Sequence, residues 1–442
     1  GDVNERDARG ISKLLQAILD LDARRAEALI SGGAKVDEAD NLGRLPLVAA
    51  AESGQTEVAR LLMEADPGAD PNEPSAGGVR PLLAATVNGH IEVAKLLLDK
   101  GARPDTPNNI GETPLAAACL FGHQELVDLL LSRKADPSRA DRANETPAYM
   151  AALGGHPDAM ASLIRADADL TTRTRAGFDP LAAASENGHL ACTALLLEAG
   201  ADLNQTGPRG ITPLMLASRQ GHADVVQLLL DKGAKVDARS IDQFTPLMLA
   251  ARFGRVEVAE LLINHKAEID ARSDTEATPL LYTAVAGHDT VARLLIKSGA
   301  DTNATDVNGL TVLMGAASAL EVDVVRSVIA KGAKVAAVDH LGRTALFFAA
   351  QMNNADSIDA LIAGGSAIDT RTNDNFTPLM AACARQREDA ALKLIAAGAD
   401  VNAVGGKELT PLILASGTGM PKVVKALLDK GAKVDAAAAE GQ

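Results

Sequence analysis

Apolar and polar residues follow a unit of 33 residues along this chain, and the unit is clearest in residues 210–238, GITPLMLASRQGHADVVQLLLDKGAKVDA. Residues 214–217, LMLA, have the composition of one short helix, and residues 225–230, VVQLLL, have the apolar stripe of a second helix. The pair Gly221-His222 separates the two. Residues 235–244, KVDARSIDQF, are polar and turn-rich, so they predict an extended, hairpin-like loop that projects sideways.

The ends of both helices carry residues suited to those positions. Thr212 can cap the first helix, and Pro213 at its first position sacrifices no hydrogen bond, because that N–H group has no partner within a helix. Gly233 stands where the second helix should end in the left-handed conformation. Helices this short bury little apolar surface alone. Stacking of successive copies solves this, since each fully buried Leu stabilises the stack by roughly 1.5 to 3 kcal/mol.

The position of Thr212 recurs through the whole chain and defines thirteen units. A two-residue insertion, Asp66-Pro67, shifts the register once, between the second and third units. The equivalent positions of the other twelve units are Ser12, Leu45, Arg80, Thr113, Thr146, Asp179, Thr245, Thr278, Thr311, Thr344, Thr377 and Thr410.

A repeat of this length with TPL near its start and a glycine after its second helix resembles the ankyrin repeat. The resemblance covers nearly the whole chain and implies an all-α, ankyrin-repeat solenoid of stacked helix-turn-helix pairs with projecting β-hairpin loops. The His that follows TPL in the family is replaced, for example by Met215, Met248, Met314 and Met380, so its hydrogen bonds are not expected here. The alanine-rich TPLM version is more similar to bacterial members of the family.

The domain organisation follows from the register. We expect a disordered tail over residues 1–9, a single solenoid over residues 10–436, and a frayed tail over residues 437–442. Within the solenoid, residues 10–39 and 405–436 are expected to be the terminal capping repeats.

Several units depart from the pattern at positions with special backbone conformations. Lys134, Asp167 and Lys266 replace the glycine after the second helix, at a cost on the order of 1 kcal/mol each. In units ten to twelve, the Gly-His turn becomes Leu320-Glu321, Asn353-Asn354 and Gln386-Arg387, which predicts an altered turn between the helices of those units.

Composition narrows the possible partners. The net charge is −15 and no run of Lys or Arg occurs, which disfavours nucleic acid, and no apolar run is long enough to span a membrane. Only 2% of residues are aromatic, which fits thin helical layers better than a large globular enzyme. We expect a monomer. Because the sequence begins without Met, a periplasmic or secreted location is the favoured expectation over the cytoplasm.

Residues capable of chemistry occupy structural registers. Cys119, Cys192 and Cys383 replace core residues of different units, which predicts buried thiols that form no disulfide. Six histidines share one register, on layers about 10 Å apart, so no two of them can bind one metal ion. The six are His90, His123, His156, His189, His222 and His288. Motifs for phosphate binding, nucleophilic catalysis and zinc binding are absent from the sequence, so we expect no enzyme activity, no cofactor and no metal.

Large and basic residues gather at the positions through which, as the resemblance implies, ankyrin repeats bind partners. These positions lie four, three and one residues before the capping residue, and seven and eight residues after it. The candidate partner-binding residues are Phe121, Arg175, Phe178, Arg209, Ile211, Arg219, Phe244, Arg252, Phe253 and Phe376. Aromatic and Arg side chains are enriched at interface hot spots. The alternative is that a large residue before the cap only packs against the neighbouring loop.

The leading hypothesis is therefore a non-catalytic scaffold that binds a partner protein in a groove centred on units four to eight. The resemblance allows an inhibitor or protective partner of an enzyme, or a secreted effector aimed at a host protein. The alternative hypothesis is a small-ligand receptor with its pocket near the irregular units ten to twelve.

Overall fold

The computed structural model describes residues 2–435, in which twenty-six short α-helices follow one another as pairs. Within these residues no extended strand occurs, and two isolated bridges join Arg6 to Ser12 and Thr305 to Thr311. The chain divides within helix α13 (Pro213–Gln220) into two compact units, residues 1–216 and 217–442, which are described separately. The all-α prediction is confirmed.

The first unit contains six helix pairs before α13. They are α1 (Lys13–Leu19), α2 (Ala23–Ser31), α3 (Pro46–Glu52), α4 (Thr56–Glu64), α5 (Pro81–Val87), α6 (Ile91–Asp99), α7 (Pro114–Phe121), α8 (Gln124–Ser132), α9 (Pro147–Gly154), α10 (Pro157–Arg165), α11 (Pro180–Glu186) and α12 (Leu190–Glu198). Two 3-10 turns, Ala76–Gly78 and Pro208–Gly210, lie in its loops.

The second unit continues with α14 (Ala223–Asp231), α15 (Pro246–Arg252), α16 (Val256–Asn264), α17 (Pro279–Ala286), α18 (Asp289–Lys297), α19 (Val312–Ala319), α20 (Val322–Ala330), α21 (Ala345–Met352), α22 (Ala355–Ala363), α23 (Pro378–Ala384), α24 (Glu388–Ala396), α25 (Pro411–Gly417) and α26 (Pro421–Asp429). A 3-10 turn at Gly406–Glu408 precedes α25.

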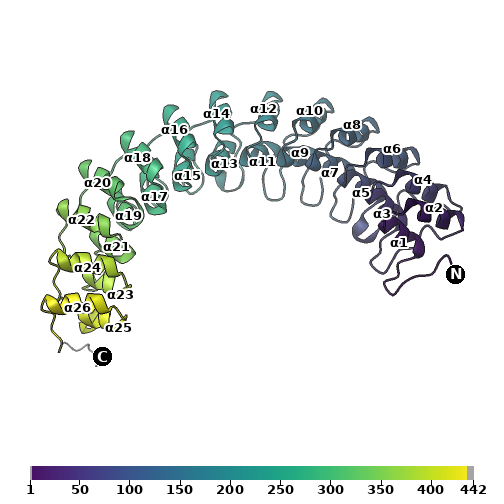
Figure 1. Cartoon of the computed structure of the whole chain (residues 1–442). Helices are drawn as coiled ribbons and strands as arrows, with labels where there is room; N and C mark the ends of the chain where they lie inside the picture. Colours follow the sequence, from purple (N-terminus) through teal and green to yellow (C-terminus); the bar gives the residue numbers. More distant parts are fainter. Residues whose placement is uncertain (1, 436–442) are drawn as a thin grey trace. The chain divides into compact units, whose positions relative to one another are not determined.

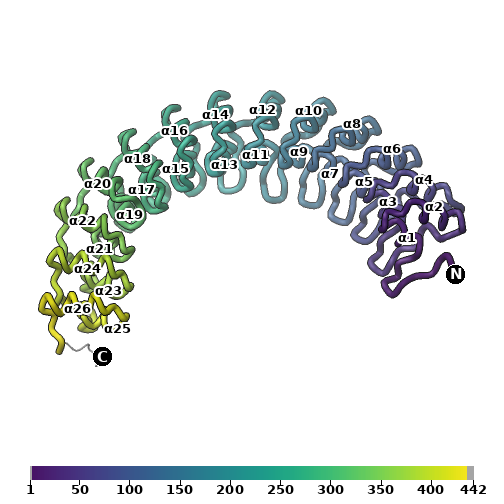
Figure 2. Tube along the Cα trace, viewed as in Figure 1, coloured from purple at the N-terminus to yellow at the C-terminus, as the bar shows by residue number. Residues whose placement is uncertain are grey.

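Within each unit the helices form two layers (Figure 1). Odd-numbered helices pack on odd-numbered neighbours, as α7 does on α9, and even-numbered helices pack on even-numbered neighbours, as α8 does on α10. Loops leave the odd-numbered layer on the side away from the even-numbered layer (Figure 2). We call the surface made by these loops and the exposed side of the odd-numbered helices the loop face.

The capping residues act as the sequence predicts. The backbone of Thr113 is extended, and its hydroxyl accepts a hydrogen bond from the Ala116 N–H group at 3.2 Å. Thr212 caps α13 in the same way through Met215 N–H, at 3.3 Å. At Leu45 and Arg80 no side-chain cap forms, and Pro46 and Pro81 follow them at the first helical position. Proline has no N–H group, and the Thr hydroxyl accepts a hydrogen bond from an N–H group of the first turn. Both reduce the number of unsatisfied N–H groups at the helix start.

The core of each unit is a run of small and branched apolar side chains shared between neighbouring pairs. In α16, for example, Val258, Ala259 and Leu262 are each at most 1% exposed. In the stripe predicted for α14, Leu229 is buried and Leu228 is only half-buried. The first pair differs as a terminal layer should: Arg24 and Arg25 of α2 are exposed.

A ladder of backbone hydrogen bonds joins successive loops on the loop face. In the first unit, Arg142 N–H donates to the Ile110 carbonyl at 3.0 Å, and Arg175 N–H donates to the Ala143 carbonyl at 2.7 Å. The same bond recurs in the second unit, for example from Val307 to Thr275 at 2.9 Å. Pro208 occupies the next donor position and has no N–H group, so this ladder bond cannot form there. The loops are thus held by their neighbours as well as by their own helices.

The predicted left-handed positions are confirmed. Gly233 has a φ of 93°, and the substituted positions Lys134, Asp167 and Lys266 have φ values of 64°, 55° and 66°. A side chain with a Cβ atom is strained in this conformation. The stack therefore imposes the backbone geometry even where the sequence does not supply glycine.

The prediction of an altered turn in units ten to twelve is right for one unit and wrong for two. Leu320 is extended, with a φ of −101°, and its side chain is only 3% exposed. Asn353 and Gln386 instead adopt the ordinary left-handed turn, with φ values of 62° and 57°. Gln386 is exposed and adopts this conformation despite its poor preference for it.

The insertion after α4 changes one turn and leaves the packing of neighbouring pairs intact. Normally the residue after the helix-ending glycine bonds five residues back, as Ala102 N–H does to the Leu97 carbonyl. After the insertion Ala69 N–H bonds seven residues back, to the Leu62 carbonyl at 2.9 Å. The two extra residues are absorbed within that turn.

The segment near the start differs from the disorder expected for residues 1–9. Asp7 N–H donates to the Ile11 carbonyl at 3.0 Å, and Lys35 N–H donates to the Asn4 side chain at 2.8 Å. Polar groups of residues 2–9 therefore have partners within the first repeat. The frayed tail expected at residues 437–442 lies outside the described residues.

Candidate functional site

Three predicted residues of the second unit form an aromatic cluster around one guanidinium group. Phe244 precedes α15, Arg252 is its last residue, and Phe253 follows it. The Arg252 Cζ atom lies 5.8 Å from the Phe244 ring centre, 6.0 Å from the Phe253 ring and 5.9 Å from the ring of Tyr282 in α17. These distances are within the range of cation–π attraction. We call Phe244, Arg252, Phe253 and Tyr282 the aromatic cluster.

The aromatic cluster is held firmly on one side and open on the other. The Phe244 and Tyr282 rings are 5.1 Å apart, and the Tyr282 hydroxyl donates to the Ser273 Oγ atom at 2.9 Å. Phe253 is 43% exposed, and Arg252 is also exposed. Within the described residues, the Arg252 guanidinium forms no hydrogen bond or ion pair. Its N–H donors are thus positioned by the rings and remain available.

Tyr282 is not among the predicted residues, because it lies four residues after the capping residue Thr278, outside the positions predicted to bind a partner. The same position holds Leu249 in the preceding repeat and Phe348 two repeats later. An aromatic residue in place of a small or aliphatic one at this position is the sequence signal that could have identified Tyr282. Residues at this position can form the wall of a cleft. Tyr282 lines a cleft of about 430 Å³ together with Phe244 and Arg252.

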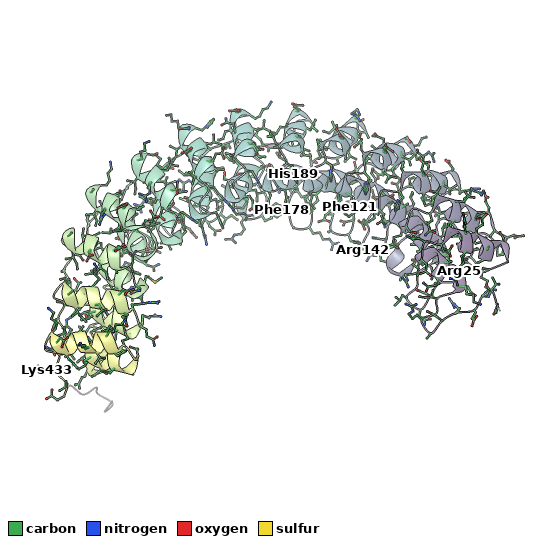
Figure 3. All side chains as sticks on the ribbon, viewed as in Figure 1. Arg25, Phe121, Arg142, Phe178, His189 and Lys433 are labelled. Atoms are coloured by element: carbon green, nitrogen blue, oxygen red, sulfur yellow. The ribbon has the colours of Figure 1, made fainter. Side chains whose placement is uncertain are left out.

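The first unit carries five of the predicted residues on its loop face. Phe121 is 48% exposed, and its ring lies 6.2 Å from that of His123. Figure 3 shows Phe121 and Phe178 on the side of the loops, with Arg142 on a loop beside them. Arg175 and Arg209 are exposed, and Ile211 is half-buried.

Phe178 fits the alternative interpretation, in which the large residue before the cap packs against a neighbouring loop. It is half-buried, and a Cβ atom added to Gly207 would lie 3.4 Å from its ring. The ring therefore contacts the next loop. Of the Phe side chains predicted in the first unit, Phe121 is the more exposed and the better candidate for contact with another molecule.

Phe376 lies apart from the aromatic cluster, in a cleft of about 320 Å³ between α21 and α23. Phe347 and Arg385 also line this cleft. Arg385 is exposed, and its guanidinium has no hydrogen bond or ion pair within the described part of the chain. Arg219, the remaining predicted residue, is half-buried in the second unit. The ten predicted residues thus do not form one cluster.

The shared register of histidines has a structural use. In His90, His123, His189 and His288, the ring Nε2 atom lies 3.0 to 3.2 Å from a carbonyl oxygen near the end of the odd-numbered helix in the preceding repeat. A carbonyl only accepts, so Nε2 carries the proton in each case. Figure 3 shows His189 among the helices, away from the loop tips. Across residues 2–435, no group of three or more His, Cys, Asp or Glu side chains is arranged to hold a metal ion.

The cysteines are buried and unpaired, as predicted. Burial raises the pKa of the Cys192 thiol to about 11 and that of the Cys383 thiol to about 12, and it raises the pKa of Cys119 as well. Such thiols are protonated at neutral pH and react poorly.

Helices in the described part of the chain are all too short or too polar to cross a bilayer.

Comparison with known families gives consistent matches along the chain. A model described as "Ankyrin repeats (3 copies)" matches residues 67–141, 137–207, 203–273, 267–339 and 335–405. A single "Ankyrin repeat" model matches residues 42–76 and 407–439. No curated protein matches the chain.

Proposed function

This chain belongs to the ankyrin repeat family, and from that premise we propose that it is a non-catalytic, monomeric scaffold that binds a partner protein on its loop face. Ankyrin repeats generally mediate protein–protein interaction. The observation that carries the proposal is the aromatic cluster, which combines an exposed ring with a guanidinium group whose donors are unused. The net charge of −15 favours a monomer, because copies of the chain repel one another.

The physical case rests on what a partner gains by covering the cluster. Phe253 exposes much of its ring to water, and full burial of such a side chain stabilises a complex by about 1.5 to 3 kcal/mol. Tyr282 and Phe244 already hold Arg252 in place, so little side-chain entropy is lost when its guanidinium binds a partner's acceptor. Aromatic residues and Arg are the side chains most often found in interface hot spots.

The test compares two apolar side chains of equal exposure on different layers of the second unit. Phe253→Asp changes the loop face, and Leu428→Asp changes α26, where Leu428 is 42% exposed. Each variant is used to capture proteins from a lysate of the source organism, and the captured proteins are identified by mass spectrometry. We expect Phe253→Asp to reduce the captured partner at least about tenfold, whereas Leu428→Asp leaves it unchanged.

Melting temperatures of both variants provide the folding control. If Phe253→Asp and the double variant with Arg252→Ala capture the same partner as the parent chain does, the loop face of the second unit is not the binding surface. If the captured partner is an enzyme, its activity is measured with and without the chain. An inhibitor lowers the activity of the enzyme, and a protective partner lengthens its active lifetime. A captured host protein would support the effector hypothesis.

A second candidate function is a small-ligand receptor at the cleft lined by Phe347, Phe376 and Arg385. The unpaired Arg385 guanidinium beside aromatic walls favours an anionic, partly apolar ligand. A thermal shift screen of such compounds tests it, because a ligand at 100 times its Kd adds about 2.7 kcal/mol of stability. The Arg385→Ala variant should lose that shift.

A further inference from the structure

The first unit contains an apolar cleft on its loop face that none of the predicted residues lines. The cleft has a volume of about 320 Å³ and lies over α3 and α5, beneath the loop that follows the insertion. Its floor consists of Val48, Ala49, Leu83 and Ala84, and its walls include Val79 and Val87. It is therefore separate from the aromatic cluster of the second unit.

Small side chains four residues after the capping residue create this cleft. Ala49 and Ala84 occupy that position in α3 and α5, whereas Leu249 and Tyr282 occupy it in α15 and α17. The overlying loop is also small, with Ala76 followed by two glycines. Ala49 and Ala84 both line the cleft, so a larger side chain at either position would occupy part of it. The fold tolerates large residues at this position, as Tyr282 demonstrates.

The charged groups around the cleft leave its rim acidic. Arg44 is paired with Asp40, whose carboxylate lies 2.8 Å from the Arg44 Nε atom. Glu112 accepts a hydrogen bond from the Asn108 side chain at 2.9 Å. Glu52 is exposed, and its carboxylate has no partner within the described residues. The Arg80 guanidinium also lies beside the cleft, where it donates to the carbonyl oxygens of Gly78 and Pro107. Because Arg44 is paired with Asp40, the two carboxylates of Glu52 and Glu112 outnumber this one positive charge, and the local potential is negative.

We propose that this cleft binds an apolar side chain from a basic segment of a partner protein. The apolar side chain enters over Ala49 and Ala84, and Lys or Arg residues beside it in the partner lie near Glu52 and Glu112. The net charge of −15 acts in the same direction, because it steers basic surfaces toward the chain. This inference rests on the proposed scaffold function and specifies the chemistry of the partner.

The experiment uses a defined probe, a fluorescently labelled peptide of sequence KLKKLLKKLK, whose affinity for the full chain is measured by fluorescence anisotropy. One reference peptide has Glu in place of every Lys, and a second has Ser in place of every Leu. We expect the Lys-Leu peptide to bind at least about tenfold more tightly than either reference, because only it supplies both the apolar side chain and the positive charge.

Three variants locate the binding site. Ala84→Tyr fills the cleft with the residue that α17 carries at this position. We expect this variant to lower the affinity for the Lys-Leu peptide at least about tenfold. Glu52→Gln removes a rim charge and should weaken binding severalfold, and the effect should shrink at high salt. Glu257→Gln removes one charge from the exposed side of α16 and should change the affinity by less than about twofold.

Several outcomes would overturn the proposal. They are an unchanged affinity in Ala84→Tyr, equal weakening by Glu52→Gln and Glu257→Gln, and binding of the Glu peptide as tight as that of the Lys-Leu peptide. If Ala84→Tyr melts early, Ala49→Leu fills the same cleft with a residue found at the equivalent position in α15, and the same result is required of it. Phe253→Asp separates the two proposals, since it should impair capture of the partner without changing peptide affinity.

Discussion

The Nε–H group of Arg255 donates a hydrogen bond of 3.0 Å to the carbonyl oxygen of Arg219, and one repeat later His288 makes the equivalent bond to the Arg252 carbonyl at 3.0 Å. Arg387 does the same to the Gln351 carbonyl at 2.9 Å. Different side chains thus satisfy the same acceptor at the end of an odd-numbered helix. The bond, and not the imidazole, is what the stack requires.

Replacement of Arg255 tests this interpretation. Arg255→Ala leaves the Arg219 carbonyl without its donor and should lower the free energy of unfolding by about 1 kcal/mol, whereas Arg255→His should retain most of it, because His288 makes the same bond. Urea titration followed by circular dichroism measures both. Equal losses in the Ala and His variants would indicate that Arg255 acts through its aliphatic packing.

Lys266 provides a test of backbone strain. It follows α16 with a φ of 66°, at the position where Gly233 follows α14 with a φ of 93°. Lys266→Gly should raise the free energy of unfolding by about 1 kcal/mol, because glycine adopts this conformation without strain. The reciprocal change, Gly233→Ala, should lower it by about the same amount, since a Cβ atom there meets nothing within 4 Å and only the backbone is strained. Opposite signs in chemical denaturation are the expected result.

The repeat pattern predicted most of the fold because its signals are local. Thr113 before Pro114 specifies a helix start, and Gly233 specifies a helix end, without reference to any other repeat. The turn conformation at Leu320 and Gln386 could not be predicted from the local sequence. Both replace a turn glycine, but Leu320 becomes extended and buries its side chain, while Gln386 accepts a left-handed backbone. The difference accompanies side-chain burial, since Leu320 is only 3% exposed and Gln386 is exposed.

The candidate site was predicted in part, for a related reason. The spacing of Phe244, Arg252 and Phe253 within one repeat indicated that they share a surface, and they do. Tyr282 belongs to the next repeat, so the spacing within one repeat does not predict its contact with Arg252. Ala84 contributes to the cleft because its side chain is small, so a search for large residues does not find it. Sites that depend on two repeats, or on a missing side chain, require the packed structure.

Asp179 should make stability depend on pH in a direction opposite to most carboxylates. Asp179 caps α11 in place of Thr, and burial raises its pKa above the usual value. The folded chain therefore binds a proton more tightly than the unfolded chain does. The contribution of Asp179 is fully favourable below the unfolded pKa of about 3.9 and is lost as pH rises through the folded pKa.

The variant Asp179→Thr isolates this effect, since Thr146 and Thr212 cap the equivalent helices of the two neighbouring repeats. It should be more stable than the parent chain at pH 7, and the advantage should shrink as the pH falls toward 3. Thermal melts of both chains across that range measure the difference. An advantage that is constant with pH would mean that Asp179 titrates in the folded chain as it does in the unfolded one.

Leu320 and Gln386 finally offer a pair of substitutions to glycine with opposite expected signs. Leu320→Gly should lower the free energy of unfolding by at least about 2 kcal/mol, because it removes a side chain that is only 3% exposed from a backbone that is already unstrained. Gln386→Gly should raise it by up to about 1 kcal/mol, because it relieves a φ of 57° at an exposed site. Chemical denaturation measures both. If Leu320→Gly were stabilising instead, the extended turn would be a strained substitute for the usual one, and its buried side chain would add little to the packing of α19 against α21.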